Sequence, residues 1–261
     1  MMTGKKPFVK AEEGSNNSVV YYDEDGNKLI RYWKKRDDEP VEQASTRSWR
    51  NNNPGNLVNG DFSKRNGSIG FAGGVPGTKC KFAVFPDYAT GRKAQAKRLK
   101  EGNLYIDSTL NNFVRKYTGV KPGAPDTSEV INYRKAIRFF TKFDMERTIR
   151  SLNDAEYEEL LDSMKKHEGW REGREEYIEV KKILGVHYNR KRVISEFLVG
   201  DDETSAWIPK SDAIALAEEG RLHAIVVYAK QSTYLRPAYH HTPFRQMICV
   251  VEDEDVSLIT V

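Results

Sequence analysis

Apolar residues in the middle of the chain recur at helical spacing rather than in strand-like alternation. After residue 87, side chains at i, i+3, i+4 and i+7 repeatedly fall on one face, which is typical of amphipathic helices. Capping residues and a terminal glycine mark several of the helix ends. The pattern predicts four helices, at about 90–100, at 108–119, after the capping pair Asp126 and Glu129, and after the capping pair Asn153 and Glu156.

Shorter apolar runs on both sides of this helical segment predict strands. Residues 19–22 and 29–33 flank an Asp-Gly step, which indicates a β-hairpin. Residues 60–77 are rich in glycine and can hold only short strands and turns. Beyond residue 180 the predicted order is strand, strand, helix, strand and a last strand, at 182–188, 193–199, 210–219, 222–228 and 246–251.

These elements predict an α+β chain in three parts. Residues 1–46 form a hairpin and a polar linker, and residues 47–173 form a mostly α domain with a short, irregular β region at its start. A charged connector leads to a small α+β domain at 180–261. The sequence shows no internal repeat.

Charge and composition exclude several classes of function. The 42 basic and 38 acidic residues are well mixed and give a net charge of only +4, so we expect no nucleic-acid partner. The mean hydropathy is −0.69, and no apolar run is long enough to cross a bilayer, so we expect no membrane span. The polar start of the sequence lacks a conventional export signal, which indicates synthesis in the cytoplasm.

An asparagine-rich stretch, Arg-Asn-Asn-Asn-Pro-Gly-Asn at 50–56, predicts a tight polar loop. Neighbouring aromatic and cationic side chains add a stacking ring and a fixed positive charge. Such a surface suits the hydroxyl and amide groups of a sugar, although a simple turn cluster is the alternative. We expect outward-facing, substrate-binding side chains at Trp49, Arg50, Asn51, Asn52, Asn53 and Asn56.

Glu168 is the candidate catalytic acid. The apolar stripe of the fourth predicted helix, at 157, 160, 161 and 164, continues to position 168 at the helix C-terminus. Partial burial and the negative end of the helix dipole both raise the pKa of a carboxyl group there. A raised pKa is what a general acid near neutral pH requires. The alternative is a frayed helix end from which Glu168 reaches solvent.

A glycosidase ordinarily needs a second carboxylate or a positioned water. Asp61 is the preferred candidate and Asp87 is another, although each also fits a turn or helix-start residue. A single-acid mechanism assisted by the substrate's own N-acetyl or 6-hydroxyl group needs neither. We expect no metal or cofactor, because His167 has no second histidine at helical spacing, and Cys80 and Cys249 lack partner spacing.

Three motifs resemble a lysozyme-like family of phage virion proteins and bacterial secretion-system effectors. They are RSWRNNNPGNL at 47–57, FAVFPDYATGR at 82–92 and HEGW at 167–170. The resemblance covers about 47–173 and implies a mostly α, lysozyme-like domain that degrades peptidoglycan. Residues 185–189, Gly-Val-His-Tyr-Asn, resemble part of a small bacterial domain of unknown function, for which we expect a docking or delivery role.

The resemblance implies a peptidoglycan glycan-strand hydrolase of the muramidase type, with Glu168 as the acid. It implies action in the periplasm or cell wall after delivery by a phage particle or a contractile (type VI) secretion apparatus. Expected partners are peptidoglycan, a virion or secretion component, and a cognate immunity protein against this antibacterial toxin. Two alternatives remain open: a catalytically inert wall-binding or virion structural protein, and a peptidoglycan amidase or peptidase.

Overall fold

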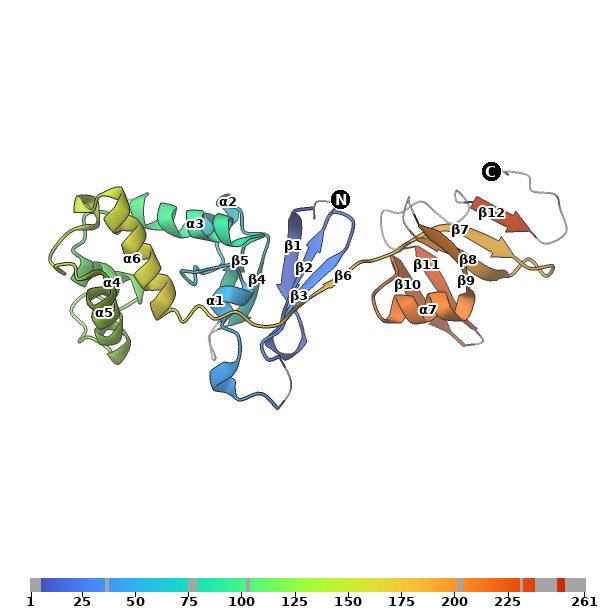
Figure 1. Ribbon diagram of the computed structural model, residues 1–261, viewed down its shortest axis with the longest axis horizontal. Helices are drawn as coiled ribbons and strands as arrows, with labels where there is room; N and C mark the ends of the chain where they lie inside the picture. Colours follow the sequence, from blue (N-terminus) through green and yellow to red (C-terminus); the bar gives the residue numbers. More distant parts are fainter. Residues whose placement is uncertain are drawn as a thin grey trace. The chain divides into compact units, whose positions relative to one another are not determined.

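The chain forms two compact units, seen in a computed structural model (Figure 1). The structure describes residues 6–35, 38–74, 79–101, 104–200, 204–230, 232–237 and 248–251. The first unit takes its residues from 1–24 and 29–176, and the second takes them from 25–28 and 177–261.

The strands of the first unit form a six-stranded mixed sheet. Its strand order is β5-β4-β1-β2-β3-β6. Strand β1 pairs antiparallel with β2 and parallel with β4, and β4 pairs antiparallel with β5. The predicted hairpin is present as the neighbours β2 and β3. The strands are β1 (Phe8–Glu13), β2 (Val19–Asp23), β3 (Lys28–Arg31), β4 (Gly70–Gly74), β5 (Lys81–Val84) and β6 (Glu175–Ile178).

A glycine makes the parallel contact between β1 and β4 possible. Ala11 pairs with Gly70, and a Cβ atom added at Gly70 would lie 1.9 Å from the Ala11 carbonyl oxygen. Any other residue there would force the two strands apart, since real contacts are never that short. Gly70 therefore allows β1, and with it the β2–β3 hairpin, to form one sheet with β4 and β5.

The helices of the first unit enclose a separate apolar core. Residues of α3 to α6 make up most of that core, including the fully buried Leu99, Phe113, Ile137 and Leu161. Besides three short 3₁₀ turns, η1 (Ser15–Asn17), η2 (Val41–Gln43) and η3 (Ile149–Ser151), the helices are α1 (Arg47–Arg50), α2 (Asp61–Arg65), α3 (Tyr88–Lys100), α4 (Leu110–Tyr117), α5 (Ser128–Thr141) and α6 (Asp154–His167).

The four long helices were predicted, but two of their starts differ from the prediction. Helix α4 begins at Leu110, with Thr109 as its cap, rather than at residue 108. Asn153 and Glu156 form the predicted capping box of α6. At the start of α5, however, the capping residue is Thr127, whose side chain accepts a hydrogen bond from the Val130 backbone N–H. The predicted capping residue Asp126 instead pairs with two arginines, because its carboxylate lies between α4 and α5. The cap prediction at Asp126 was therefore wrong.

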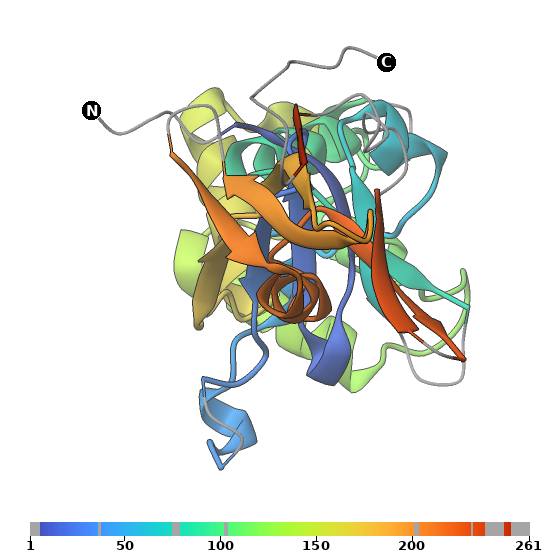
Figure 2. The same cartoon turned by 90° about the vertical axis from the view of Figure 1, so that its right-hand side faces the viewer.

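The second unit is an α+β arrangement with its own core, around Val186, Phe197 and Ala213. A sheet of order β12-β7-β8-β9 and a β10-β11 pair make up its strands. Its helix packs against β8, β9 and β10 (Figure 2). The elements are β7 (Lys182–Tyr188), β8 (Ile194–Gly200), β9 (Ser205–Pro209), α7 (Lys210–Glu218), β10 (Ala224–Ala229), β11 (Ser232–Pro237) and β12 (Ile248–Val251).

Most of the elements predicted beyond residue 180 are present, with two additions. Strands β9 and β11 were not predicted. Trp207 lies in β9 and pairs with Leu198 of β8. The glycine stop of α7 is confirmed, since Gly220 has a positive φ of 67°. Residues 246–247 of the predicted last strand lie outside the described residues.

The prediction of a mostly α, lysozyme-like fold was wrong. Helices make up 35% of the structure and strands 29%, with a large six-stranded mixed sheet and further sheets. The physical reason is long-range pairing. Strand β1 shows no readable alternation, because only Ala11 in it is buried, and it becomes a strand through its neighbours β2 and β4. Strands β1 and β4 lie on opposite sides of the 34–46 segment in the sequence, yet they are neighbours in the sheet.

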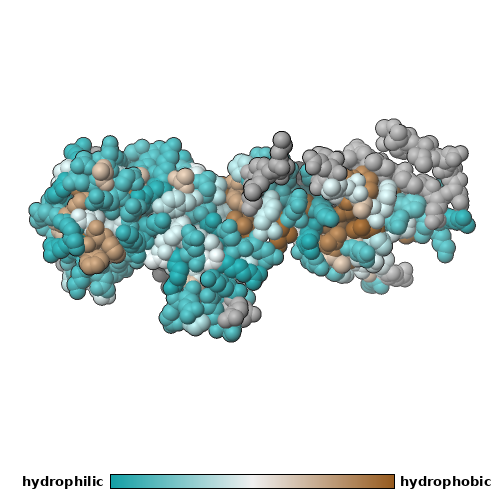
Figure 3. All heavy atoms as spheres, in the orientation of Figure 1, coloured by the Kyte–Doolittle hydropathy of each residue, from teal (hydrophilic) through white to brown (hydrophobic). Residues whose placement is uncertain are grey.

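The face of the first unit shown in Figure 3 is mostly hydrophilic, with a small apolar patch over α5. Phe139 and Phe140 are the exposed apolar side chains of that helix's C-terminal turns, and their rings lie 5.1 Å apart. No helix among the described residues is both long enough and apolar enough to traverse a bilayer.

We expect Gly91→Ala to destabilise the protein although alanine favours helices. An added Cβ at Gly91 of α3 would lie 1.8 Å from the Asn52 carbonyl oxygen, and overpacking of this kind costs about 1–3 kcal/mol. Urea unfolding should show this loss. The matched control is Gly60→Ala, where the backbone is extended and a Cβ meets nothing within 4 Å. Equal stability of the two variants would contradict the close approach.

Candidate active site

The asparagine loop connects α1 to the sheet, and its amides bind backbone groups inside the fold. Asn53 is fully buried. Its side-chain N–H group donates to the carbonyls of Leu57 and Ala83, each at 2.9 Å, and its amide oxygen accepts from the Leu57 N–H at 2.8 Å. Asn51, 1% exposed, donates to the Ala72 carbonyl at 3.3 Å. These contacts fasten the loop to β4 and β5.

Asn52 adopts the left-handed conformation, with a φ of 50°, which asparagine tolerates better than most residues. Its side-chain N–H group donates to the carbonyls of Phe85 and Pro86, both at 3.1 Å. Its amide oxygen accepts from Arg31 of β3 at 2.6 Å. Both ends of the Asn52 side chain are therefore occupied within the protein.

The aromatic and cationic residues before the loop are also internal. Trp49 is 5% exposed, and the Arg31 guanidinium lies 4.6 Å from the centre of its ring. Arg50 is 8% exposed and donates to the carbonyl and hydroxyl oxygens of Ser45, at 2.6 and 3.0 Å. The Arg50 carbonyl accepts a hydrogen bond from the buried Tyr21 hydroxyl.

The expectation of an outward-facing sugar surface is therefore wrong for most of this motif. The structure gives internal hydrogen-bond partners to the side chains predicted to bind substrate at Arg50, Asn51, Asn52 and Asn53, and it buries Trp49. The physical reason is that buried backbone acceptors within β4 and β5, and just after β5, must be paired. The amides of the loop supply those partners.

Asn56 differs from the other asparagines of the motif. It is half-buried, its φ is 46°, and its side-chain N–H group donates to Oε2 of Glu168 at 2.6 Å. Its amide oxygen is buried and has no hydrogen-bond partner among the described residues. Asn56 therefore links the loop directly to the predicted catalytic acid.

Glu168 is the C-cap of α6, as the continued apolar stripe predicted, and its side chain is half-buried. Besides the Asn56 contact, its Oε1 atom accepts a long hydrogen bond of 3.4 Å from the Tyr133 hydroxyl. Gly169 follows with a φ of 69°, which ends the helix and fixes the carboxyl group at this point.

Burial raises the pKa of the Glu168 carboxyl above its ordinary value, and this is the largest effect on it. Hydrogen bonds from Asn56 and Tyr133 and the positive charge of Arg47 act in the opposite direction, while the negative charge of Glu129 adds to the rise. The net shift is upward. A carboxyl group with a raised pKa and fixed hydrogen-bond donors can act as a general acid.

A cavity of about 310 Å³, the Asn56 cavity, begins at this loop. Asn56, the exposed Asp61 at the start of α2, and Tyr117 lie in its lining. Arg98 and Tyr105 of the helical region line it as well. The structure thus brings Asn56 together with Glu168 by a hydrogen bond, and with Asp61 in one cavity.

Sequence reasoning missed the residues around Glu168 that come from α1 and α5. The Tyr133 ring lies 3.9 Å from that of His167, centre to centre, and its hydroxyl reaches Glu168. Burial lowers the pKa of His167, which favours its neutral form. A buried tyrosine hydroxyl needs a partner, and this was the available signal. Arg47 and Glu129 gave none.

The remaining candidate residues from the sequence are Asp87 and the two cysteines. Asp87 caps α3 by accepting a hydrogen bond from the Thr90 N–H at 2.7 Å. Cys80 is half-buried. The side chain of Cys249 lies outside the described residues. Among the residues described, no group of three or more histidine, cysteine, aspartate and glutamate side chains is placed to hold a metal ion.

Comparison with known proteins assigns no family to the chain. No protein-family model matches it, and no curated protein matches it.

The raised pKa of Glu168 has a consequence for stability. The pKa of Glu168 in the folded protein lies above its ordinary value of 4.5. Its contribution to the free energy of unfolding is therefore complete below pH 4.5 and is lost as the pH rises through the folded-state pKa. We therefore expect Glu168→Gln, which cannot ionise, to gain stability relative to wild type between pH 4 and pH 8. Urea unfolding at both pH values measures this, with the exposed Glu159→Gln of the same helix as the charge control. A free energy of unfolding of Glu168→Gln, taken relative to wild type, that stays constant or falls from pH 4 to pH 8 would contradict the raised pKa.

Proposed function

We propose that this protein is a glycoside hydrolase that cleaves the glycan strand of peptidoglycan, in the manner of a muramidase. The observation that carries the proposal is Glu168, a half-buried carboxyl group with a raised pKa, held at a helix end by Asn56 and Tyr133. A carboxyl group in this setting remains protonated closer to neutral pH than an exposed one, and can protonate a leaving glycosidic oxygen.

The neighbours of Glu168 also suit the second half of such a cycle. Once the proton has left, the carboxylate keeps the hydrogen bonds from Asn56 and Tyr133 and the nearby charge of Arg47. These groups stabilise the ionised form of Glu168. They therefore offset part of the cost that burial adds to proton transfer to the substrate. Efficient acid catalysis needs this balance, because the acid must both hold and release its proton.

Two carboxylates compete for the role of base or charge stabiliser. Asp61 lines the Asn56 cavity, where a sugar ring or an attacking water would lie next to the amide that contacts Glu168. Glu129, exposed in the first turn of α5, interacts with Glu168 through its charge. We assign the role to Asp61, since it lines the cavity together with Asn56, the residue that donates to Glu168. A substrate-assisted mechanism would leave both carboxylates dispensable.

The choice of peptidoglycan rests on the polar side chains in the lining of the Asn56 cavity and on the sequence motifs. The cavity presents Asn56, Asn59, Asp61 and Arg98, which are groups that hydrogen-bond sugar hydroxyl and acetamido substituents. The motifs at 47–57, 82–92 and 167–170 resemble those of wall-degrading virion proteins and secreted effectors. We propose the same setting here: delivery to the cell wall by a phage particle or a secretion apparatus, and a cognate immunity protein as partner.

The test is digestion of purified sacculi by wild type and by Glu168→Gln, with mass spectrometry of the released products. Loss of the general acid should lower the rate by about 10²–10⁴, while Glu159→Gln, the exposed control in α6, should keep it. Wild type should release intact disaccharide-peptides. Free stem peptides would indicate an amidase, and no release by wild type would indicate a binding protein, so either result would overturn the proposal.

We further expect Asn56→Ala to change the pH profile of that activity. Loss of the Asn56 hydrogen bond removes an influence that lowers the pKa of Glu168, so the alkaline limb of the rate profile should move to higher pH. Asn59→Ala is the matched control, because Asn59 lines the same cavity without a hydrogen bond to Glu168. An alkaline limb that moves equally in both variants, or in neither, would contradict the assignment of Glu168 as the acid.

A further inference from the structure

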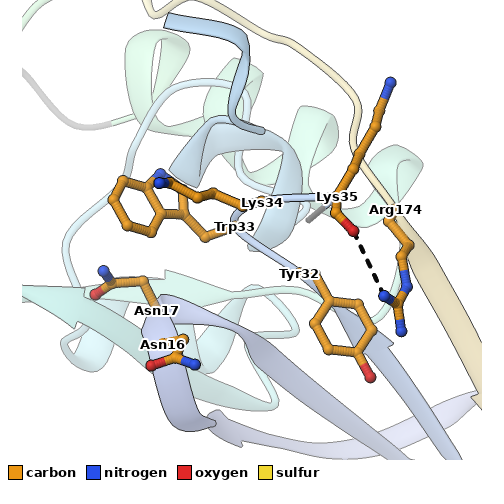
Figure 4. A pocket seen from close by; sticks show the side chains of 7 residues that line it. All are labelled: Asn16, Asn17, Tyr32, Trp33, Lys34, Lys35 and Arg174. Atoms are coloured by element: carbon orange, nitrogen blue, oxygen red, sulfur yellow. Dashed lines mark hydrogen bonds between the residues drawn. The ribbon is translucent and has the colours of Figure 1, made fainter. Parts of the chain in front are cut away.

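The first unit contains a second hollow, of about 770 Å³, that shares no lining residue with the Asn56 cavity. We call it the Trp33 pocket. Its lining comes from three segments: Asn16 and Asn17 of η1, residues 32–35 after β3, and Arg174 just before β6 (Figure 4). Its size is in the range of pockets that hold small ligands, about 300–1,000 Å³.

The lining of the Trp33 pocket combines aromatic rings with positive charge. The half-buried rings of Tyr32 and Trp33 share the lining with Lys34, Lys35 and Arg174, and none of the described lining residues is acidic. Figure 4 shows the two rings on neighbouring residues, with Lys34 beside Trp33 and Arg174 beside Tyr32, while the Lys35 side chain points away from both rings.

The cations also contact the rings directly. The Arg174 guanidinium lies 4.1 Å from the centre of the Tyr32 ring, and the Lys34 ammonium lies 5.3 Å from that of Trp33. Glu176 offsets part of the charge, since it pairs with Arg174 at 2.9 Å and accepts from the Tyr32 hydroxyl. Arrangements of this kind bind ligands that carry both a flat face and a negative group.

The backbone below the rings is fixed before any ligand arrives. The Ser45 hydroxyl donates to the Tyr32 carbonyl at 2.7 Å, and the Ser45 N–H donates to the Trp33 carbonyl at 2.7 Å. Arg50 in turn holds the Ser45 carbonyl at 2.6 Å. Tyr32 also donates its backbone N–H to the Arg174 carbonyl at 3.0 Å. The buried arginine of the asparagine motif thus supports this pocket through Ser45.

The amide side of the pocket is equally defined. Asn16 and Asn17 both have left-handed backbones, with φ of 51° and 58°. The turn that contains them is closed by the Gly14 N–H donating to the Ser18 carbonyl at 2.9 Å, and by the Ser18 hydroxyl donating to Ser15. Both asparagine side chains remain exposed at the pocket. They offer donors and acceptors to hydroxyl or acetamido groups.

We propose that the Trp33 pocket is a second glycan-binding site, for a carboxylated, N-acetylated segment of the wall polymer. The rings of Tyr32 and Trp33 would stack on the apolar face of a sugar, and the asparagine pair would bind its acetamido or hydroxyl groups. The cations would neutralise a lactyl or stem-peptide carboxylate. The identity of the polymer rests on the proposed function, whereas the ligand chemistry rests on the pocket.

A nucleic acid is the rival ligand, because stacking rings with nearby cations also suit single strands. The observations favour the glycan. A single-strand site needs a positive groove that follows several phosphates, whereas the described lining of the Trp33 pocket holds three cations among seven residues and the chain as a whole carries a net charge of only +4.

The test is calorimetric binding to the full-length chain carrying Glu168→Gln, so that no ligand is cleaved. The ligands are a soluble muramic-acid-containing disaccharide-tetrapeptide, uncharged chitotetraose and a short oligo(dT). The muramyl ligand should bind best. Trp33→Ala should weaken it at least about tenfold, and Trp207→Ala, an exposed tryptophan of the second unit, should leave it unchanged. Lys34→Gln with Lys35→Gln should remove the preference over chitotetraose and reduce the dependence on salt.

Several outcomes would overturn the inference. They are no binding of the muramyl ligand, unchanged affinity in Trp33→Ala with its fold intact by circular dichroism, or tighter binding of oligo(dT). The failure of this inference and that of the proposed function are distinguishable. Sacculus cleavage that depends on Glu168 but is unaffected by Trp33→Ala, with no loss of binding, would refute only the pocket. Binding that depends on Trp33 without any cleavage by wild type would refute only the hydrolase.

Discussion

The first unit depends on hydrogen bonds between the asparagine loop and the backbone of its surroundings. Asn51 and Asn53 pair with carbonyls of β4 and β5, and Asn52 joins the segment after β5 to Arg31 of β3. In a buried region each unpaired backbone group costs about 1–3 kcal/mol. The three side-chain amides of the loop therefore supply hydrogen bonds to backbone carbonyls that a neighbouring strand would otherwise supply.

The same loop positions the chemistry that we propose. Because Asn53 and its neighbours are fixed inside the fold, the chain emerges at Asn56 in a defined conformation, and the Asn56 amide meets Glu168 at the end of α6. Arg50, buried beneath the loop, supports Ser45 and through it the Trp33 pocket. The asparagine loop and Arg50 thus support both Glu168 and the Trp33 pocket, although the Trp33 pocket and the Asn56 cavity share no lining residue.

Local patterns predicted the elements well and their assembly poorly. The long helices α3 to α6 and strand β7 lie where periodicity placed them, since helical spacing and capping residues act within a few positions. Strand β1 and its parallel contact with β4 were missed, and the mostly α prediction failed with them. That contact depends on Gly70 admitting the Ala11 carbonyl, which no pattern within one segment can show.

The sequence by itself determined that Glu168 would end a helix on its core-facing side, because helical spacing alone fixes which face a residue occupies. It also determined that residues 50–56 would be a tight polar loop. Only the tertiary structure decided which way those amides point, since backbone groups of distant strands compete with solvent for them. Tertiary packing likewise brought Tyr133, Arg47 and Asn56 to Glu168, because burial and contact across 35 to 121 positions are properties of the packed chain and not of any segment.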